Sequence, residues 1–263
     1  MTKIAFIGMG NMAQAIVKGI IKSEKVMKEN LLAYAPNQDK LKKNSEIYGF
    51  VPYSDIGKLI SDSDVIIIAC KPYQIEAILK EYGSSFSGKN LLSVAAGWDF
   101  AKYKALLPEN VSIQFVMPNT PAMVGKGVFL FEKTNSFDEN ERKQIIALFM
   151  TMGLVEELPS NLMGIGGAVT GCGPAFVDLM IEAYADAAVK YGISRASAYK
   201  LVSQTVLGSA ALCLETGEHP AVLKDAVCSP NGTTIRGVAA LEENGFRNSC
   251  IKSIDAIMEF KKN

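Results

Sequence analysis

The sequence predicts an α/β protein in which a doubly wound parallel sheet is followed by an all-helical domain. Three observations predict this fold class. Short apolar runs alternate with amphipathic stretches through the first 160 residues, a glycine-rich turn follows the first apolar run, and no strand-like alternation occurs after about residue 161. We therefore expect two closely packed domains, residues 1–160 and residues 161–263.

Seven short segments rich in apolar and β-branched residues are expected to form the strands. They are nearly continuous apolar runs, which is typical of parallel strands covered by helices on both faces. The expected strands are residues 3–7, 31–35, 64–70, 90–95, 111–116, 128–131 and 154–157. Amphipathic segments such as residues 12–21 and 139–150 lie between them, and this alternation implies right-handed crossovers.

The second part of the chain carries helical periodicity only. Apolar side chains recur at helical spacing over residues 174–191, and this stripe stops at Gly192. Further helices are expected over residues 194–215, 233–244 and 247–261. The helices over residues 174–215 carry an apolar and alanine-rich surface that is wider than one small domain needs, so we expect an interface between copies of the chain. The alternative is that this surface packs entirely within one chain.

Composition excludes several classes of function. The 27 Lys and Arg residues balance 27 Asp and Glu residues, which argues against a nucleic-acid or membrane partner and favours a small molecule. The five cysteines form no C-x-x-C pair, so we expect reduced thiols, a cytoplasmic location and no metal site. We find no apolar run that approaches the roughly 18 residues that span a bilayer, so no membrane-spanning helix is expected. His219 is the only histidine, which excludes histidine-based triads.

The first candidate site is the segment Gly8-Met9-Gly10-Asn11-Met12-Ala13, which follows the first strand and begins a helix. In this G-x-G-x-x-A pattern the first glycine makes a tight turn, the second lets the backbone approach a pyrophosphate, and the small third residue lets helix and strand pack closely. The pattern predicts a Rossmann-type nucleotide site at the helix N-terminus. The alternative is a strand-to-helix turn without a ligand.

The end of the second strand predicts which dinucleotide would bind. An NAD site usually has an acidic residue here for the ribose 2′-hydroxyl, and none occurs before Asp39. Asn37 and Lys40 are therefore candidate partners of a 2′-phosphate. We expect NADP(H) as the cofactor, with NAD(H) less favoured. Alternatively, Lys40 belongs only to a solvated helix face.

Two further segments place polar groups where a ligand would lie. Lys71, followed by Pro72, ends the strand expected beside the nucleotide-binding strand, although it is equally well explained as a surface lysine. Ser229-Pro230-Asn231-Gly232-Thr233-Thr234 predicts a turn and then a helix, so backbone N–H groups and hydroxyls converge at a helix N-terminus. This arrangement suits a carboxylate. The alternative is a capped helix with no ligand.

These residues resemble those of the pyrroline-5-carboxylate reductases over nearly the whole chain. The resemblance is carried by Gly8 to Ala13, Ala69-Cys70-Lys71-Pro72, Ala95-Ala96-Gly97, Met117 to Pro121, Gly171 to Ala175, and Ser229 to Ile235 with Leu241-Glu242. The last segment is the most specific, because many dehydrogenases share the glycine loop.

The resemblance implies a dinucleotide-binding domain over residues 1–160 and a helical dimerisation and substrate-binding domain over residues 161–263. It implies that the cofactor contacts Gly8, Gly10, Asn11, Met12, Ala69, Lys71, Pro72, Ala95 and Gly97, to which the end of the second strand adds Asn37. It implies that the substrate contacts Ser229, Asn231, Gly232, Thr233 and Thr234, and that two chains complete each active site in a homodimer or a higher oligomer such as a ring of dimers.

The expected reaction is NADPH-dependent hydride transfer to C5 of 1-pyrroline-5-carboxylate, which gives L-proline. Thr234 is the candidate catalytic residue, because its hydroxyl would lie on the first helical turn beside the ring nitrogen. Three departures from the family pattern are Asn231 in place of glycine, Phe115 in place of arginine, and Ile56 in place of an asparagine.

Two other functions remain open. A β-hydroxyacid dehydrogenase shares this plan but normally uses a lysine of the helical domain, and no lysine occurs between Gly164 and Val189. A dinucleotide-binding regulator without activity is the non-enzymatic alternative.

Overall fold

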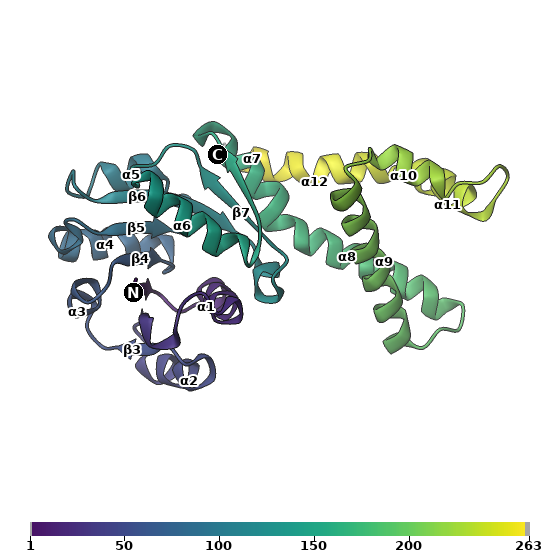
Figure 1. Ribbon diagram of the computed structural model, residues 1–263. Helices are drawn as coiled ribbons and strands as arrows, with labels where there is room; N and C mark the ends of the chain where they lie inside the picture. Colours follow the sequence, from purple (N-terminus) through teal and green to yellow (C-terminus); the bar gives the residue numbers. More distant parts are fainter. Residues whose placement is uncertain (1, 261–263) are drawn as a thin grey trace. The chain divides into compact units, whose positions relative to one another are not determined.

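The computed structural model describes residues 2–260, and the chain forms two compact units (Figure 1). The first unit ends at Gly171 and the second begins at Cys172, whereas the sequence placed a boundary after residue 160. The intervening segment stays with the first unit because Met163 packs in a small core with Phe115 and Leu130.

The first unit is built on an eight-stranded sheet with the strand order β3-β2-β1-β4-β5-β6-β7-β8. The strands are β1 (Ile4–Ile7), β2 (Leu31–Tyr34), β3 (Val51–Tyr53), β4 (Val65–Ile68), β5 (Asn90–Ser93), β6 (Ser112–Pro118), β7 (Gly127–Glu132) and β8 (Gly153–Leu158). The order of the first six is that of a dinucleotide-binding sheet, and the direction of winding changes between β1 and β4. β3 was not expected, because its three residues are too few to show a pattern.

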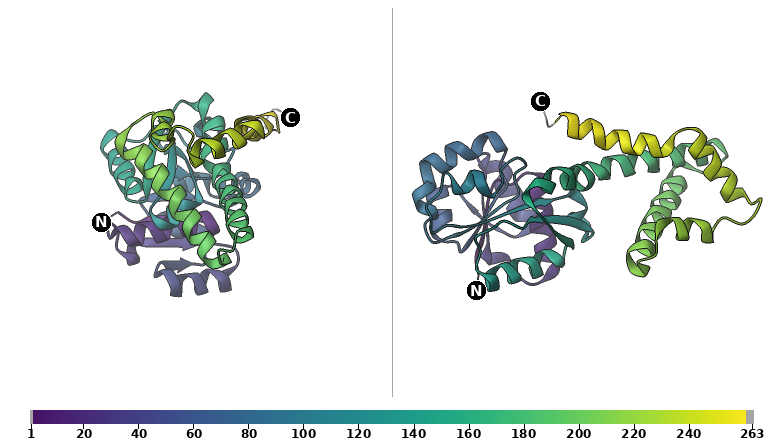
Figure 2. Two further views of the ribbon diagram at one scale, coloured as in Figure 1. Left: turned by 90° about the vertical axis from the view of Figure 1, so that its right-hand side faces the viewer. Right: turned by 90° about the horizontal axis from the view of Figure 1, so that it is seen from above.

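Helices cover both faces of this sheet, as the right-hand view of Figure 2 shows. They are α1 (Asn11–Ser23), α2 (Gln38–Tyr48), α3 (Ile56–Ser61), α4 (Pro72–Tyr82), α5 (Phe100–Lys104) and α6 (Glu139–Met150). Ile4 and Phe6 of β1 belong to the core under α1 and α6, and Ala5 and Ile7 belong to the core under α3, α4 and α5. The expectation of strands buried on both faces is confirmed for β1 and β4, whose residues are all buried.

One pair of strands departs from the expected parallel sheet. β7 runs antiparallel to β6, and β8 then pairs parallel to β7 at the edge of the sheet. The connection between β6 and β7 covers only residues 119–126, which is shorter than the dozen or so residues that a parallel crossover requires. The length of this interval was a signal for the reversal.

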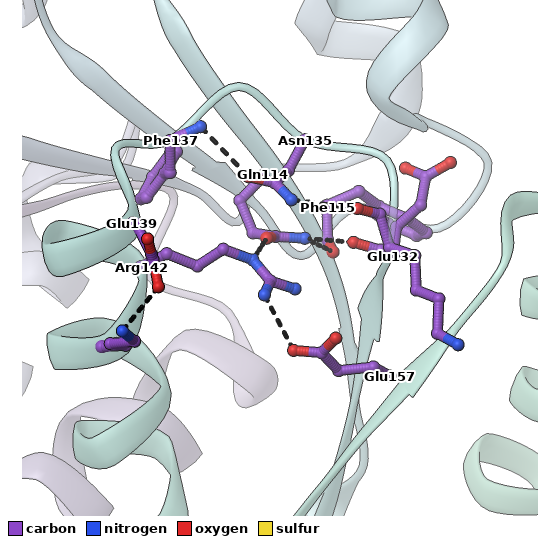
Figure 3. A network of polar contacts seen from close by, with 10 residues as sticks. Gln114, Phe115, Glu132, Asn135, Phe137, Glu139, Arg142 and Glu157 are labelled. Carbon is purple, nitrogen blue, oxygen red and sulfur yellow. Dashed lines mark hydrogen bonds and ion pairs between the residues drawn. The ribbon is translucent and has the colours of Figure 1, made fainter.

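A polar network holds the edge strands β7 and β8 to the rest of the sheet (Figure 3). Gln114 of β6 is fully buried and donates through Nε2 to the carbonyl oxygen of Glu132 on β7 over 2.9 Å. Its Oε1 accepts from Nε of Arg142 on α6 over 3.1 Å, and Nη1 of Arg142 lies 2.8 Å from Oε1 of Glu157 on β8. Four elements are therefore linked through two side chains.

The second unit contains helices only, as expected. After α7 (Met163–Gly167) and the π-helical turn Ala168–Cys172, it comprises α8 (Gly173–Lys190), α9 (Arg195–Thr216), α10 (Pro220–Ala226), α11 (Thr233–Glu243) and α12 (Phe246–Phe260). The expected start and end of α9 are confirmed: the Ser194 side chain accepts from the Ser197 N–H, and Gly217 ends the helix at a positive φ of 67°. The short helix α10 was not expected.

The second unit has almost no core of its own in a single chain. Among its described residues only Ala185 and Ala198 are buried. Large apolar side chains are exposed instead, including Leu179 at 66% and Leu214 at 78%. Such a surface is typical of an interaction site.

The helical stretch Ser160–Lys190 corrects one expectation. By length and composition alone it could cross a membrane, with a mean hydropathy of 1.3 over its most apolar window. Small residues interrupt the apolar ones in this stretch and break up the apolar run, although no charged residue occurs from Ser160 to Val177.

Candidate active site

A cleft of about 750 Å³ lies in the first unit, where β1, β2, β4 and β5 end. Ligands of doubly wound sheets bind at this edge, at the point where the winding reverses. The structure brings nine of the ten expected cofactor residues to this cleft: Gly8, Gly10, Asn11, Met12, Asn37, Ala69, Lys71, Pro72 and Ala95. Gly97 follows Ala95 and Ala96 on the same loop but does not line the cleft.

The two glycines of the first loop suit their positions for different structural reasons. Gly8 has a φ of +104°, and a Cβ placed there would lie 2.5 Å from the backbone nitrogen of Cys70. Gly10 has no atom within 4 Å of such a Cβ, so the space beside it is open. It precedes α1, whose N-terminus has no side-chain cap. The free N–H groups of this first turn suit a phosphate.

The charged side chains that line the cleft are all positive. Its lining residues include Lys40 and Lys71 and no acidic side chain. Asn37 also lines it, and its Oδ1 caps α2 by accepting from the Lys40 N–H over 2.9 Å. A 2′-phosphate is compatible with this end of the cleft, because no carboxylate repels it.

The loop after β4 is held by its neighbours. The Ala69 N–H donates to the carbonyl of Ile7 over 2.9 Å, and the Lys71 N–H donates to Oε1 of Gln74 over 3.1 Å. Burial raises the pKa of the Cys70 thiol to about 11, so this group is neutral at physiological pH. It offers the cleft a weakly polar surface and no charge.

Three lining residues lie outside the segments that the sequence assigned to the cofactor. Gln74 and Ile78 lie on α4, three and seven residues after Lys71, so helical spacing from Lys71 was a signal that pointed to them. Thr120 follows β6 and also lines the cleft. Its neighbour Asn119 is buried, where it donates to the Thr170 carbonyl over 3.0 Å and accepts from the Val128 N–H over 2.8 Å. Asn119 therefore fixes the path of the chain after β6.

Two departures from the family pattern lie in the core instead of the cleft. Phe115 is 3% exposed and packs with Leu130 and Met163, and Ile56 is 7% exposed in the core under α3. Neither residue lines the cleft. Both positions therefore have a packing reason for an apolar side chain.

The expected substrate loop, residues 229–234, belongs to the second unit. It forms a tight turn in which the Gly232 N–H donates to the Ser229 carbonyl over 3.0 Å. Asn231 has a φ of 57°, a left-handed conformation that asparagine tolerates better than other non-glycine residues. Its Oδ1 accepts from Nη2 of Arg236 over 2.8 Å. A Cβ at Gly232 would lie 2.4 Å from Oγ of Ser229, so a side chain there would displace the Ser229 hydroxyl.

The two threonines after this turn begin α11. The N-cap residue is Gly232, and no side chain caps this helix. Within residues 2–260 the hydroxyls of Thr233 and Thr234 have no hydrogen-bond partner. The arrangement leaves these hydroxyls and the N–H groups of the first turn available to an anion.

Comparison with known proteins gives two family matches. The model for pyrroline-5-carboxylate reductase dimerisation matches residues 160–263. The model for NADP oxidoreductase, coenzyme F420-dependent, matches residues 3–97.

Relatives match over nearly the full length. The chain is 37% identical to the pyrroline-5-carboxylate reductase of Treponema pallidum (strain Nichols), covering 97% of this chain and 98% of the relative. It is 38% identical to that of Escherichia coli (strain K12), with coverage of 98% and 96%. A crystal structure of Plasmodium falciparum pyrroline carboxylate reductase with NADP bound has a TM-score of 0.89 at 32% identity, with coverage of 99% and 97%. A Mycobacterium tuberculosis 3-hydroxyisobutyrate dehydrogenase, at 15% identity, covering 74% of this chain and 67% of that chain, with a TM-score of 0.53, shares only the fold.

Proposed function

The chain belongs to the pyrroline-5-carboxylate reductase family, and we propose that it reduces 1-pyrroline-5-carboxylate to L-proline with NADPH. The observation that carries this proposal is the 37% and 38% identity to named reductases over 97% and 98% of the chain. The cleft fits the cofactor, because it offers an open glycine loop, an uncapped helix N-terminus, two lysines and no carboxylate.

The residues of the cleft bind and orient the cofactor in this proposal. The first-turn N–H groups of α1 hold the diphosphate beside Gly10, and Asn37 and Lys40 hold the 2′-phosphate. Loops 69–72 and 94–97 form the walls around the nicotinamide. When bound, NADPH supplies the hydride.

The substrate loop acts on the other reactant. The Gly232 N–H is already bonded to the Ser229 carbonyl, so the N–H groups of the α11 first turn, from Thr233 onwards, hold the substrate carboxylate, together with Ser229 and Asn231. The Thr234 hydroxyl accepts a hydrogen bond from the protonated imine nitrogen. C5 of this iminium ion gains the hydride, and the nitrogen keeps its proton and becomes the secondary amine of proline. Little acid–base catalysis is needed, so positioning supplies most of the rate acceleration.

Oligomer formation is part of the proposal. The match to a dimerisation family over residues 160–263 and the exposed apolar helices support a homo-oligomer. We infer a dimer in which both chains complete each active site, with a ring of dimers as the larger assembly. Five free cysteines are compatible with the reducing cytoplasm, where we place the protein.

Oxidation of NADPH with and without pyrroline-5-carboxylate tests the reaction. Substrate-dependent oxidation with formation of proline is the expected result. Absence of turnover from a folded protein that binds NADPH would indicate a regulator, and oxidation of a β-hydroxyacid with NAD⁺ or NADP⁺ would indicate a dehydrogenase of that class.

The choice of cofactor is tested by kcat/KM for NADPH and NADH. We expect NADPH to be preferred. The variant Asn37→Asp keeps an oxygen that can cap α2 but adds a negative charge beside the 2′-phosphate, so it should shift the preference towards NADH. A clear advantage for NADH in the unaltered protein would contradict this assignment.

A further inference from the structure

One side chain joins the two loops that form the walls of the cofactor cleft. Trp98, which follows the loop after β5, donates its indole N–H to the carbonyl oxygen of Pro72 over 3.1 Å. Pro72 is the first residue of α4 and belongs to the loop after β4. Both loops line the cleft, through Ala69 to Pro72 and through Val94 to Ala96. The hydrogen bond therefore links the two loops that follow the adjacent strands β4 and β5.

The indole ring is itself anchored to the core. It lies 5.1 Å from the ring of Tyr103, between centroids, at an interplanar angle of 50°. Tyr103 is fully buried, and its hydroxyl lies 2.9 Å from Oγ of Ser93 at the end of β5. Oγ of Ser93 also accepts from the Ala95 N–H over 3.3 Å. The wall after β5 is thus held from its beginning by Ser93 and from its end by Trp98.

The wall between these anchors has almost no side chains of its own. It consists of Ala95, Ala96 and Gly97, and it turns sharply at Gly97, where φ is +79°. The Trp98 N–H closes this turn by donating to the Ala95 carbonyl over 3.2 Å. A ligand here meets backbone and methyl groups, which have no rotamers with which to adapt. Its position therefore depends on where the backbone is held.

We propose that Trp98 is a positioning residue that fixes the separation of the two loop walls and so the placement of the nicotinamide for hydride transfer. This inference rests on the proposed function. Hydride transfer requires reacting atoms at about 3 to 3.5 Å, and a misplacement of about 1 Å costs on the order of a hundredfold in rate. The hydrogen bond from Trp98 to Pro72, called the clasp below, keeps the two loop walls from separating and so affects the rate of hydride transfer.

Two replacements of Trp98 test the clasp. Trp98→Phe keeps an aromatic ring against Tyr103 and removes the donor. Because Trp98 is the only tryptophan in the chain, growth with benzothienylalanine replaces its indole N–H by sulfur at this one position. Both proteins should lose about threefold to tenfold in kcat, the range expected for one hydrogen bond, and the Kd for NADPH should rise about threefold. The primary isotope effect with 4-deuterated NADPH should increase, and KM for pyrroline-5-carboxylate should change less than about twofold.

A matched control lies at the other end of β4 and β5, where these two strands begin. Nζ of Lys89, before β5, donates to the carbonyls of Ser61 and Ser63, before β4, over 3.1 and 2.7 Å. Lys89→Met should lower the melting temperature and leave the kinetic constants and the isotope effect unchanged.

The outcomes separate the clasp from the reaction. Wild-type kcat, isotope effect and NADPH Kd in both Trp98 replacements would overturn the clasp, whatever their melting temperatures. If the unaltered protein does not reduce pyrroline-5-carboxylate, the proposed function fails by itself. The NADPH Kd then still decides whether Trp98 shapes the cleft, because that measurement needs no substrate.

Discussion

Asn231 shows how one residue can replace another through backbone conformation. Its φ of 57° is the conformation that glycine would adopt at this turn, and asparagine adopts it at small cost. The side chain adds a contact that glycine lacks, because its Oδ1 accepts from the guanidinium of Arg236. The departure from the family pattern therefore preserves the turn that places Thr233 and Thr234.

Thr234 carries the sharpest prediction at this scale. Thr234→Val should lower kcat/KM for the imine by the equivalent of about 1 to 3 kcal/mol in transition-state binding, with NADPH affinity nearly unchanged. The reason is that its hydroxyl has no partner within residues 2–260 and is proposed to bond the ring nitrogen.

The control for this prediction is Thr234→Ser, which keeps the hydroxyl and should retain most of the activity. Steady-state kinetics and thermal melting of both variants provide the test. A wild-type kcat/KM together with a lower melting temperature in Thr234→Val would mean that the threonine only supports the helix.

Cys70 predicts a dependence of stability on pH. Burial raises the pKa of its thiol from 9.0 to about 11, and burial also raises the pKa of the Tyr103 hydroxyl above its ordinary 10.0. Above pH 9 the unfolded chain loses these protons while the folded chain keeps them, so the free energy of unfolding falls as pH rises from 9 to 11. For Cys70 the loss amounts to about 2 kcal/mol at most.

Denaturant unfolding at about pH 8 and at about pH 10.5 measures this loss. Cys70→Ala should make the decrease smaller than it is in the unaltered protein. An identical decrease in Cys70→Ala and in the unaltered protein would contradict the assignment.

At the scale of elements, the loop between β1 and α1 separates folding from binding. Gly8 is required by the backbone, because its φ is positive and Cys70 lies against it. Gly10 is not required in this way, because the space around it is open and its φ is −78°. One glycine thus serves the fold, and the other leaves room for a ligand.

The matched pair Gly8→Ala and Gly10→Ala tests this division. Gly8→Ala should lower the free energy of unfolding by more than about 2 kcal/mol, because strain and a backbone clash combine. Gly10→Ala should change it by no more than about 0.5 kcal/mol but raise the Kd for NADPH at least about tenfold, since its methyl group occupies the approach of the diphosphate. Thermal melting and NADPH titration measure both effects. Unchanged NADPH affinity in Gly10→Ala would place the diphosphate elsewhere.

At the scale of the whole molecule, the cofactor cleft and the apolar helices belong to different units. The cleft is lined by residues of the first unit alone, whereas the second unit exposes an apolar groove of about 460 Å³ lined by residues such as Phe176, Leu179 and Phe246. Oligomerisation is therefore expected to govern the substrate site while NADPH binding remains a property of the single chain.

A charge in this groove should produce an inactive monomer. Leu179→Glu should prevent association, because a carboxylate buried against apolar side chains costs several kcal/mol, and turnover should be lost while NADPH binding persists. Ile47→Glu, at a 72% exposed position of α2, is the control and should leave association and activity unchanged. Sedimentation at assay concentration decides the matter: a monomer of Leu179→Glu with wild-type kcat would exclude an active site shared between chains.

Local patterns of the sequence were sufficient for the parts of the molecule that depend on neighbours along the chain. The apolar runs that became β1, β2, β4 and β5, the glycine loop, the serine that caps α9 and the turn at Asn231 all follow from side-chain periodicity and backbone preference. All the expected cofactor residues except Gly97 line one cleft, because parallel strands of a doubly wound sheet end at the same edge.

Only the tertiary structure decided which distant groups meet. The reversal at β7, the lining of the cleft by Thr120, the Gln114 to Arg142 network and the bond from Trp98 to Pro72 join residues 18 to 28 positions apart or on different elements. Periodicity along one segment shows which face is buried, but it contains no information on which other segment covers that face. That choice depends on how the whole chain packs, and it determined the walls of the proposed site.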